Sequence, residues 1–137
     1  MIALKNSTPK DTKLLFLRDK SGKLAFIHVD LVVAFQSAGR DMLVYQYFNE
    51  KIIVSNLNMI LLEEKLEDTP FIRVGRSLFI NPDHIRDIAF SDGRYSLNMH
   101  NATTFNICPK YIETLKNVMF DRHKGNIIDL TKKKRKT

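Results

Sequence analysis

The sequence predicts a mainly β protein with two short helices. Segments whose apolar residues alternate with a period of two outnumber those with a helical period, which favours strands. Turn dipeptides such as Ser21-Gly22 and Asp92-Gly93 separate neighbouring strand candidates, as is typical of hairpins. A length of 137 residues with 44% hydrophobic residues is enough for one domain with its own core.

Five strand candidates precede the first helix. Two of them pair across Ser21-Gly22 and two across Asn49-Glu50, and one apolar strand lies between these hairpins. Residues 36–41 are polar and contain Gly39, so a loop is expected there. The five strands are expected at residues 13–18, 23–29, 31–35, 42–48 and 51–54.

The two helix candidates have start signals. Ser55 can cap the first, and Pro70 prevents its continuation. Pro109 suits the first position of the second. Strands at residues 88–90, 95–99 and 103–107 come between them, the first two joined around Asp92-Gly93. The apolar stripes are Leu57, Ile60, Leu61 and Leu66 for the first helix and Ile112, Leu115, Val118 and Met119 for the second.

Residues 71–85 are the most informative segment, because their strand pattern is interrupted by an arginine. Arg76 falls within an apolar alternation, and burying an unpaired guanidinium costs several kcal/mol. Gly75 beside it indicates a bulge or loop, so we expect the strand to kink and to direct Arg76 toward solvent. A guanidinium held on a β scaffold suits guanine edges and phosphates. The alternating apolar residues are Ile72, Val74, Leu78 and Ile80.

The order Phe-x-Arg-Val-x-Arg-Ser-x-x-x-Asn-x-x-x-Ile in this segment resembles the core signature of the LytTR family. These are the DNA-binding output domains of LytR/AlgR-type bacterial response regulators of two-component systems. The resemblance extends over roughly residues 14–119 and implies layered antiparallel sheets, with loops rather than a recognition helix entering the major groove. The matching residues are Phe71, Arg73, Val74, Arg76, Ser77, Asn81 and Ile85.

Three places are candidates for contact with DNA. They are the loop at residues 36–41, the surroundings of Arg76, and the junction at residues 106–110, where a cation and free N–H groups of a helix start can meet a phosphate. The resemblance implies the same places. The expected DNA-binding residues are Ser37, Arg40, Arg73, Arg76, Ser77 and Lys110.

Several alternatives stay open at these positions. Gly75 stands where the family often has histidine, and Cys108-Pro109 stands where it commonly has Ser-Arg. Lysine lacks the planar fork of arginine, so a bidentate guanine contact at the junction is in question. Arg73 can instead pair with a carboxylate. Asn81 is expected to close a turn through its side chain, and Arg86 and Arg94 are expected to be ordinary surface charges.

Charge is unevenly distributed along the chain. The net charge is +7, and residues 132–136 contribute five positive charges, so residues 1–131 carry 7 − 5 = +2. Residues 1–12 are expected to be a flexible lead-in, residues 13–122 the DNA-binding domain and residues 123–137 a basic, disordered tail. No additional receiver domain is expected in a chain of this length. A single cysteine, no apolar run of membrane-spanning length and no signal peptide predict a cytoplasmic protein.

The sequence offers little support for an enzyme. His28, His84, His100 and His123 show no ligand spacing with one another or with Cys108, and the five glycines are scattered. No catalytic residue, metal or cofactor is expected. The predicted partner is double-stranded promoter DNA, by resemblance with direct repeats. One alternative is a protein-interaction module that pairs with a separate regulator or with itself. Another is single-stranded nucleic-acid binding through Tyr45, Tyr47 and Tyr95.

Overall fold

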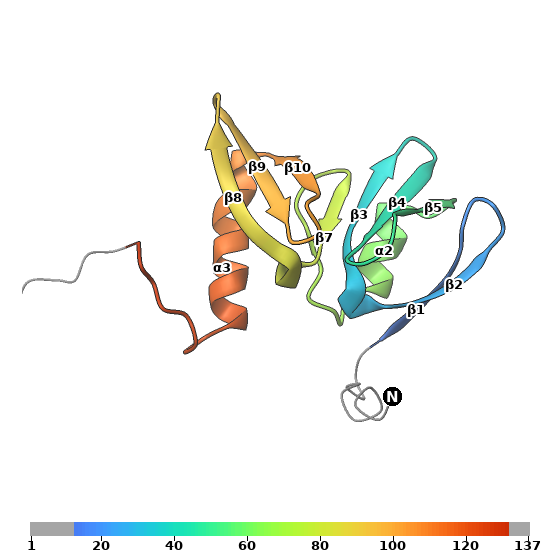
Figure 1. Cartoon of the computed structure of the whole chain (residues 1–137), viewed down its shortest axis with the longest axis horizontal. Coiled ribbons are helices and arrows are strands. Elements are labelled where there is room, and N and C mark those ends of the chain that lie inside the picture. Colours follow the sequence, from blue (N-terminus) through green and yellow to red (C-terminus); the bar gives the residue numbers. More distant parts are fainter. Residues whose placement is uncertain (1–12, 132–137) are drawn as a thin grey trace, which may run out of the picture.

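A computed structural model describes residues 13–131, which form three antiparallel sheets and two α-helices (Figure 1). The expected lead-in and the cluster at residues 132–136 lie outside the described residues. The strands are β1 (Leu14–Arg18), β2 (Leu24–His28), β3 (Val32–Ala38), β4 (Asp41–Gln46), β5 (Ile52–Ser55), β6 (Ile72–Arg73), β7 (Leu78–Ile80), β8 (Ile85–Ser91), β9 (Arg94–Met99) and β10 (Thr104–Ile107). The helices are α2 (Met59–Lys65) and α3 (Ile112–Arg122), with short 3₁₀ turns η1 (Val29–Leu31), η2 (Pro82–His84) and η3 (Pro109–Tyr111).

The sheets are layered, as expected. The middle layer is a five-stranded sheet in the order β5-β4-β3-β7-β6. The β1–β2 hairpin and α2 lie to one side of it, and the β10-β9-β8 sheet with α3 lies to the other (Figure 1). β3 is therefore covered on both faces, which is why its first four residues are all apolar and at most 1% exposed.

Two hydrophobic cores hold these layers together. The first includes Phe35, Met42, Val44, Leu62 and Phe79, with Leu15 and Leu17 of β1 packed against it. The second includes Val74, Leu78, Leu97, Met99, Phe105 and Leu115. Phe79 of β7 belongs to the first core and Leu78 of β7 to the second. The middle sheet is therefore packed on both of its faces.

The segment at residues 71–85 is a hairpin, and the prediction of a single kinked strand was wrong. β6 runs antiparallel to β7, pairing Ile72 with Ile80, and the Val74 N–H donates to the Leu78 C=O at 2.9 Å. Cross-strand partners in a hairpin point to the same face, so the apolar alternation is the same whether the chain continues or turns back. The predicted interruption at Gly75 and Arg76 is the turn itself.

The polar stretch at residues 36–41 was also assigned wrongly. β3 continues through Ala38 and β4 begins at Asp41, which leaves a tight turn at Gly39 (φ +64°) and Arg40. Gln36 pairs with Leu43 on one side and Leu78 on the other. Strand pairing on both sides overrides the polarity of this stretch.

The first helix begins three residues later than expected. Asn58, not Ser55, caps it, accepting a hydrogen bond from the Leu61 N–H at 2.9 Å. The buried face therefore differs from the predicted stripe, since Met59 and Leu62 face the core in place of Ile60 and Leu61. Met59, Leu62 and Leu66 are buried, whereas Ile60 is 76% exposed.

The other elements agree more closely with expectation. The three predicted hairpins and the final strand are confirmed, with Asp92 and Gly93 at positive φ in the β8–β9 turn. Pro109 begins the turn η3 rather than the α-helix, which starts at Ile112. Leu115 is fully buried, in line with the predicted stripe.

Candidate nucleic-acid interface

Two turns of the middle sheet lie at the same end of the molecule. β3 and β7 are antiparallel neighbours, so the end of β3 lies beside the start of β7. The Ser37 N–H donates to the Ser77 C=O at 2.8 Å, which joins the β3–β4 turn to the β6–β7 turn. The structure therefore brings together two of the three predicted contact regions.

The β6–β7 turn is held by the guanidinium of Arg73. Its Nε donates to the Gly75 C=O at 2.9 Å and its Nη2 to the Arg76 C=O at 2.8 Å. Its Nη1 donates to Glu63 Oε1 at 2.8 Å in a salt bridge with α2. Three donors of Arg73 are thus used inside the protein, as the alternative of a carboxylate partner anticipated, and the side chain is only 33% exposed.

Arg76 has the opposite environment. It is exposed, and its side chain forms no hydrogen bond or ion pair with any residue between 13 and 131. Its own carbonyl is held by Arg73, and nearby Val74 is 3% exposed within the second core. A fixed backbone therefore carries a guanidinium whose donors are available to a ligand.

The third predicted region lies at the end of the other sheet. Ile107 pairs with Tyr95 at the end of β10, so the next residues, Cys108 and Arg94, continue side by side. A hollow of about 330 Å³ lies between the β8–β9 turn and this junction. Lys110 is exposed, with its Nζ 5.2 Å from the centroid of the Tyr111 ring. The register thus places Arg94 at the junction, although the sequence indicated only an ordinary surface charge.

We call Arg40, Arg76, Arg94 and Lys110 the cationic rim. Figure 1 shows the β3–β4 turn, the β6–β7 loop, the β8–β9 turn and the start of α3 all on the upper side of this view. All four rim residues are exposed, and none of them is in an ion pair with the described part of the chain. Of the two predicted serines, Ser77 is exposed and Ser37 is half-buried.

Two carboxylates near the rim pair with cations outside it, whereas Asp92 is exposed in the β8–β9 turn, two residues from Arg94. Asp41 pairs with Lys20 at 3.0 Å, and Glu63 pairs with Arg73. Asp83 lies at the far end of the β8–β10 sheet and is held by Arg122. The charges of Asp41 and Glu63 are therefore offset by Lys20 and Arg73 and not by the rim cations.

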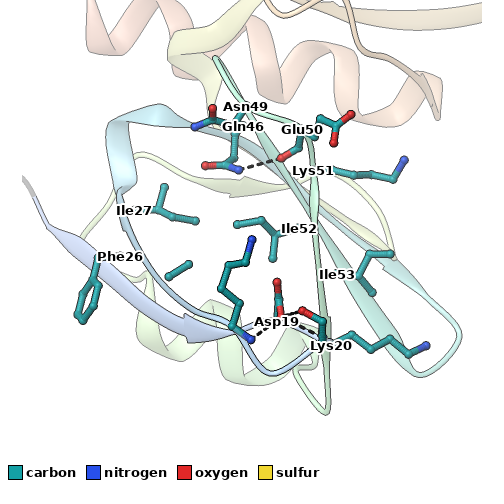
Figure 2. Close-up of a pocket in the computed structure, with 13 residues that line it drawn as sticks. Asp19, Lys20, Phe26, Ile27, Gln46, Asn49, Glu50, Lys51, Ile52 and Ile53 are labelled. Atoms are coloured by element: carbon teal, nitrogen blue, oxygen red, sulfur yellow. Dashed lines mark hydrogen bonds between the residues drawn. The ribbon is translucent and has the colours of Figure 1, made fainter.

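A hollow of about 750 Å³ lies between the β1–β2 hairpin and β5 (Figure 2). Ile27 and Ile52 point toward each other across it, and Phe26 points away. The Ser21 hydroxyl and the Lys23 N–H donate to Asp19, and these bonds lower the pKa of the Asp19 carboxyl. Asp19 thus shapes the hairpin turn. No cluster of His, Cys, Asp and Glu suited to a metal occurs within residues 13–131.

The three tyrosines considered for base stacking pack against other rings of the chain. The Tyr45 ring is 5.2 Å from Phe105, its hydroxyl donates to Gln36 Oε1 at 2.8 Å, and burial raises its pKa. Tyr47 packs against Phe48, and Tyr95 against Phe90. These contacts account for Tyr45 as a packing residue, whereas Tyr47 is 40% exposed beside an exposed Phe48.

The fold is thus a set of layered antiparallel sheets with exposed cations on turns along one side of the molecule. The model of the LytTr DNA-binding domain family matches residues 22–120, and the chain belongs to this family. In a comparison with solved structures, it is similar to a LytTr DNA-binding domain from Bacillus cereus described as part of a response regulator. That similarity has a TM-score of 0.60 and 18% identity, over 77% of this chain and 95% of that one.

The family match supports a DNA-binding regulator, and the structural likeness supports the fold. A comparison with curated proteins gave no match. No helix within residues 13–131 is long and apolar enough to span a membrane.

Proposed function

We propose that this protein is a bacterial transcriptional regulator that binds double-stranded DNA at specific sequences, with its turns in the major groove. The observation that carries the proposal is the β6–β7 turn, where the backbone is fixed and the Arg76 guanidinium is exposed. A preorganised fork of this kind can donate two hydrogen bonds to O6 and N7 of a guanine.

The other rim residues have a simpler role in this proposal. Arg40, Arg94 and Lys110 bind phosphates on either side of the groove and fix the position of the domain on the duplex. The exposed Ser77 hydroxyl lies beside Arg76 and can reach the same strand. Ser37 and Arg73 act mainly by holding the turn, through the Ser37 N–H and the guanidinium donors of Arg73.

The first experiment selects bound duplexes from a random pool, which defines the site and its strandedness. Enrichment of two spaced copies of one motif would support binding to direct repeats. No enrichment of any motif would contradict sequence-specific recognition. Promoter DNA as the ligand also assigns the protein to the cytoplasm.

The second experiment replaces Arg76. Arg76→Ala should weaken binding to the selected site by about 1–3 kcal/mol, or roughly 5- to 150-fold, and relax the preference at one base pair. Arg86→Ala is the matched control, since Arg86 is also exposed but pairs with Asp87 on β8, away from the rim. Normal footprinting by Arg76→Ala would refute the assignment of Arg76.

A further inference from the structure

An apolar groove of about 510 Å³ lies between β1 and α2, on the side of the molecule where β1 has no strand neighbour. Buried side chains that include Phe35, Leu62 and Leu66 line its depth. Phe16 and Leu61 line it as well but are 62% and 36% exposed. Large apolar side chains left in water beside a groove indicate a binding surface.

The open edge of β1 supplies backbone groups to this groove. The Val29 N–H donates to the Lys13 C=O, and the Asp19 N–H donates to the Lys23 C=O. Hydrogen-bonded pairs alternate along an antiparallel ladder, so odd-numbered residues of β1 bond to β2. The backbone groups of Leu14, Phe16 and Arg18 therefore point to the other edge, with which no strand within residues 13–131 pairs.

The charge of the groove has one sign. Its charged lining residues are Lys13, Arg18 and Lys65, and no aspartate or glutamate lines it. The chain's own ends do not complement this charge, since residues 1–12 carry two lysines and one aspartate and residues 132–136 are all basic. Charge complementarity thus favours an acidic occupant from another protein.

We propose that this groove binds an extended, acidic and apolar segment of a partner protein, which adds to the edge of β1 as a third strand. Strand addition satisfies the open backbone groups, while apolar side chains enter the groove. Lys13 and Arg18 are five residues apart, about 17 Å along a strand. The segment therefore carries carboxylates about five positions apart with apolar residues between them.

The exposed outer face of the β1–β2 hairpin extends this surface. Phe16 and Phe26 stack with ring centroids 4.9 Å apart, and Phe26 is 67% exposed. Leu14 and Leu24 lie on the same face and are 53% and 47% exposed. A strand added beside β1 would cover part of this face.

The test is a selection of displayed random twelve-residue peptides on the full chain. We expect enrichment of apolar segments with Asp or Glu about five positions apart, and amide shift changes confined to residues 13–18 and 54–66. Enriched peptides that are basic or uncharged, or no enrichment at all, would overturn the proposal.

Matched variants test the location. Leu61→Glu should weaken binding of the best selected peptide about 30-fold, as expected for an interface hot spot. Ile60→Glu should not, because Ile60 is on the same helix and more exposed but does not line the groove. Phe16→Asp and Phe90→Asp form a second pair, both wild-type side chains being 62% exposed. If the two variants of either pair lose the same amount of peptide affinity, the proposal is overturned.

Two other occupants have distinct outcomes. If deletion of residues 1–12 shifts the groove amides without peptide, the chain's own N-terminal segment is the occupant. If those amides shift with protein concentration, a second copy is the occupant. Either result would overturn the proposal that an acidic segment of a partner protein occupies the groove. Binding of the selected duplex is measured for each variant, and because none of the four rim residues lines the groove, this inference and the DNA-binding proposal fail in separate measurements.

Discussion

Arg73→Lys separates a residue that positions the DNA-contacting turn from one that contacts DNA. The substitution keeps the charge but cannot keep the geometry, because a lysine ammonium is a point donor without the planar fork. The native guanidinium reaches two carbonyls of one turn and a carboxylate of α2 at the same time. One nitrogen on a flexible stem cannot span these three acceptors.

The magnitude follows from these contacts. Hydrogen bonds from a charged donor contribute up to about 1.5–3 kcal/mol each when buried, and about 1 kcal/mol is reasonable for a side chain that is one-third exposed. The partly exposed ion pair with Glu63 adds at most about 1 kcal/mol. Losing the two carbonyl bonds therefore destabilises the turn by about 2 kcal/mol. If the turn must be ordered to bind, apparent affinity falls by up to about 30-fold.

The assay is a double-mutant cycle on duplex affinity. Arg73→Lys should weaken duplex binding strongly in the wild-type background and only slightly in the Arg76→Ala background. In the second background the guanidinium that Arg73 positions is already absent. The salt dependence of binding should not change, since the charge is retained. Glu63→Gln, which leaves both carbonyl bonds, should cost less than about fivefold.

Additive losses would refute this reasoning. If Arg73→Lys weakens both backgrounds equally, Arg73 acts independently of Arg76. If Arg73→Gln in addition lowers the salt slope by about 0.9, then Arg73 meets a phosphate directly, as the sequence first suggested. Wild-type affinity for Arg73→Lys would show that the turn needs no clamp.

Three further predictions concern stability and long-range charge. Asn81→Ala should destabilise the fold by about 2–4 kcal/mol and lower the Tm by roughly 10 °C in thermal denaturation, because Asn81 is 1% exposed and bonds both Val32 C=O and Asp83 N–H. Asp87→Asn should lower the Tm at pH 7, and this difference should shrink as the pH falls below 3.8. A hydrogen bond from Asn98, followed by Arg86, holds the pKa of Asp87 below 3.8, so its contribution is present above that pH and is lost as pH falls. Deleting residues 132–136 should weaken binding to all duplexes alike and flatten the salt dependence in fluorescence titrations.

Much of the fold was predictable because hairpins leave local signals. The turn Asp92-Gly93 uses two positive φ angles that few residues other than glycine and aspartate tolerate, and it was placed correctly. The β6–β7 hairpin was missed because its turn has no such signal. Gly75 does not have a positive φ, and the turn is stabilised by Arg73, whose Glu63 partner lies ten residues away on α2. Contacts of this kind depend on tertiary structure, and apolar alternation does not encode them.

The candidate site was predictable in part for the same reason. Arg76 was identified by its conflict with the apolar pattern around it, which is a local signal. Arg94 was not identified as a candidate, because its position beside Cys108 depends on the register between β9 and β10. Ser37 was expected on a loop and lies in β3, where its N–H is used by Ser77.

The distribution of ion pairs supports the proposal that a nearly neutral body binds a polyanion. Residues 1–131 carry only +2, so a general attraction to DNA cannot come from the body as a whole. Several acids are neutralised locally by basic partners away from the rim, as in the pairs Asp83–Arg122 and Asp87–Arg86. The four rim cations have no such partner within residues 13–131, so their charge is available to a polyanion on that side, as the charges of Lys13, Arg18 and Lys65 are at the groove. Reversing one rim charge should therefore change duplex affinity far more than reversing Lys116, which pairs with Glu113 on α3 and contributes the same formal charge.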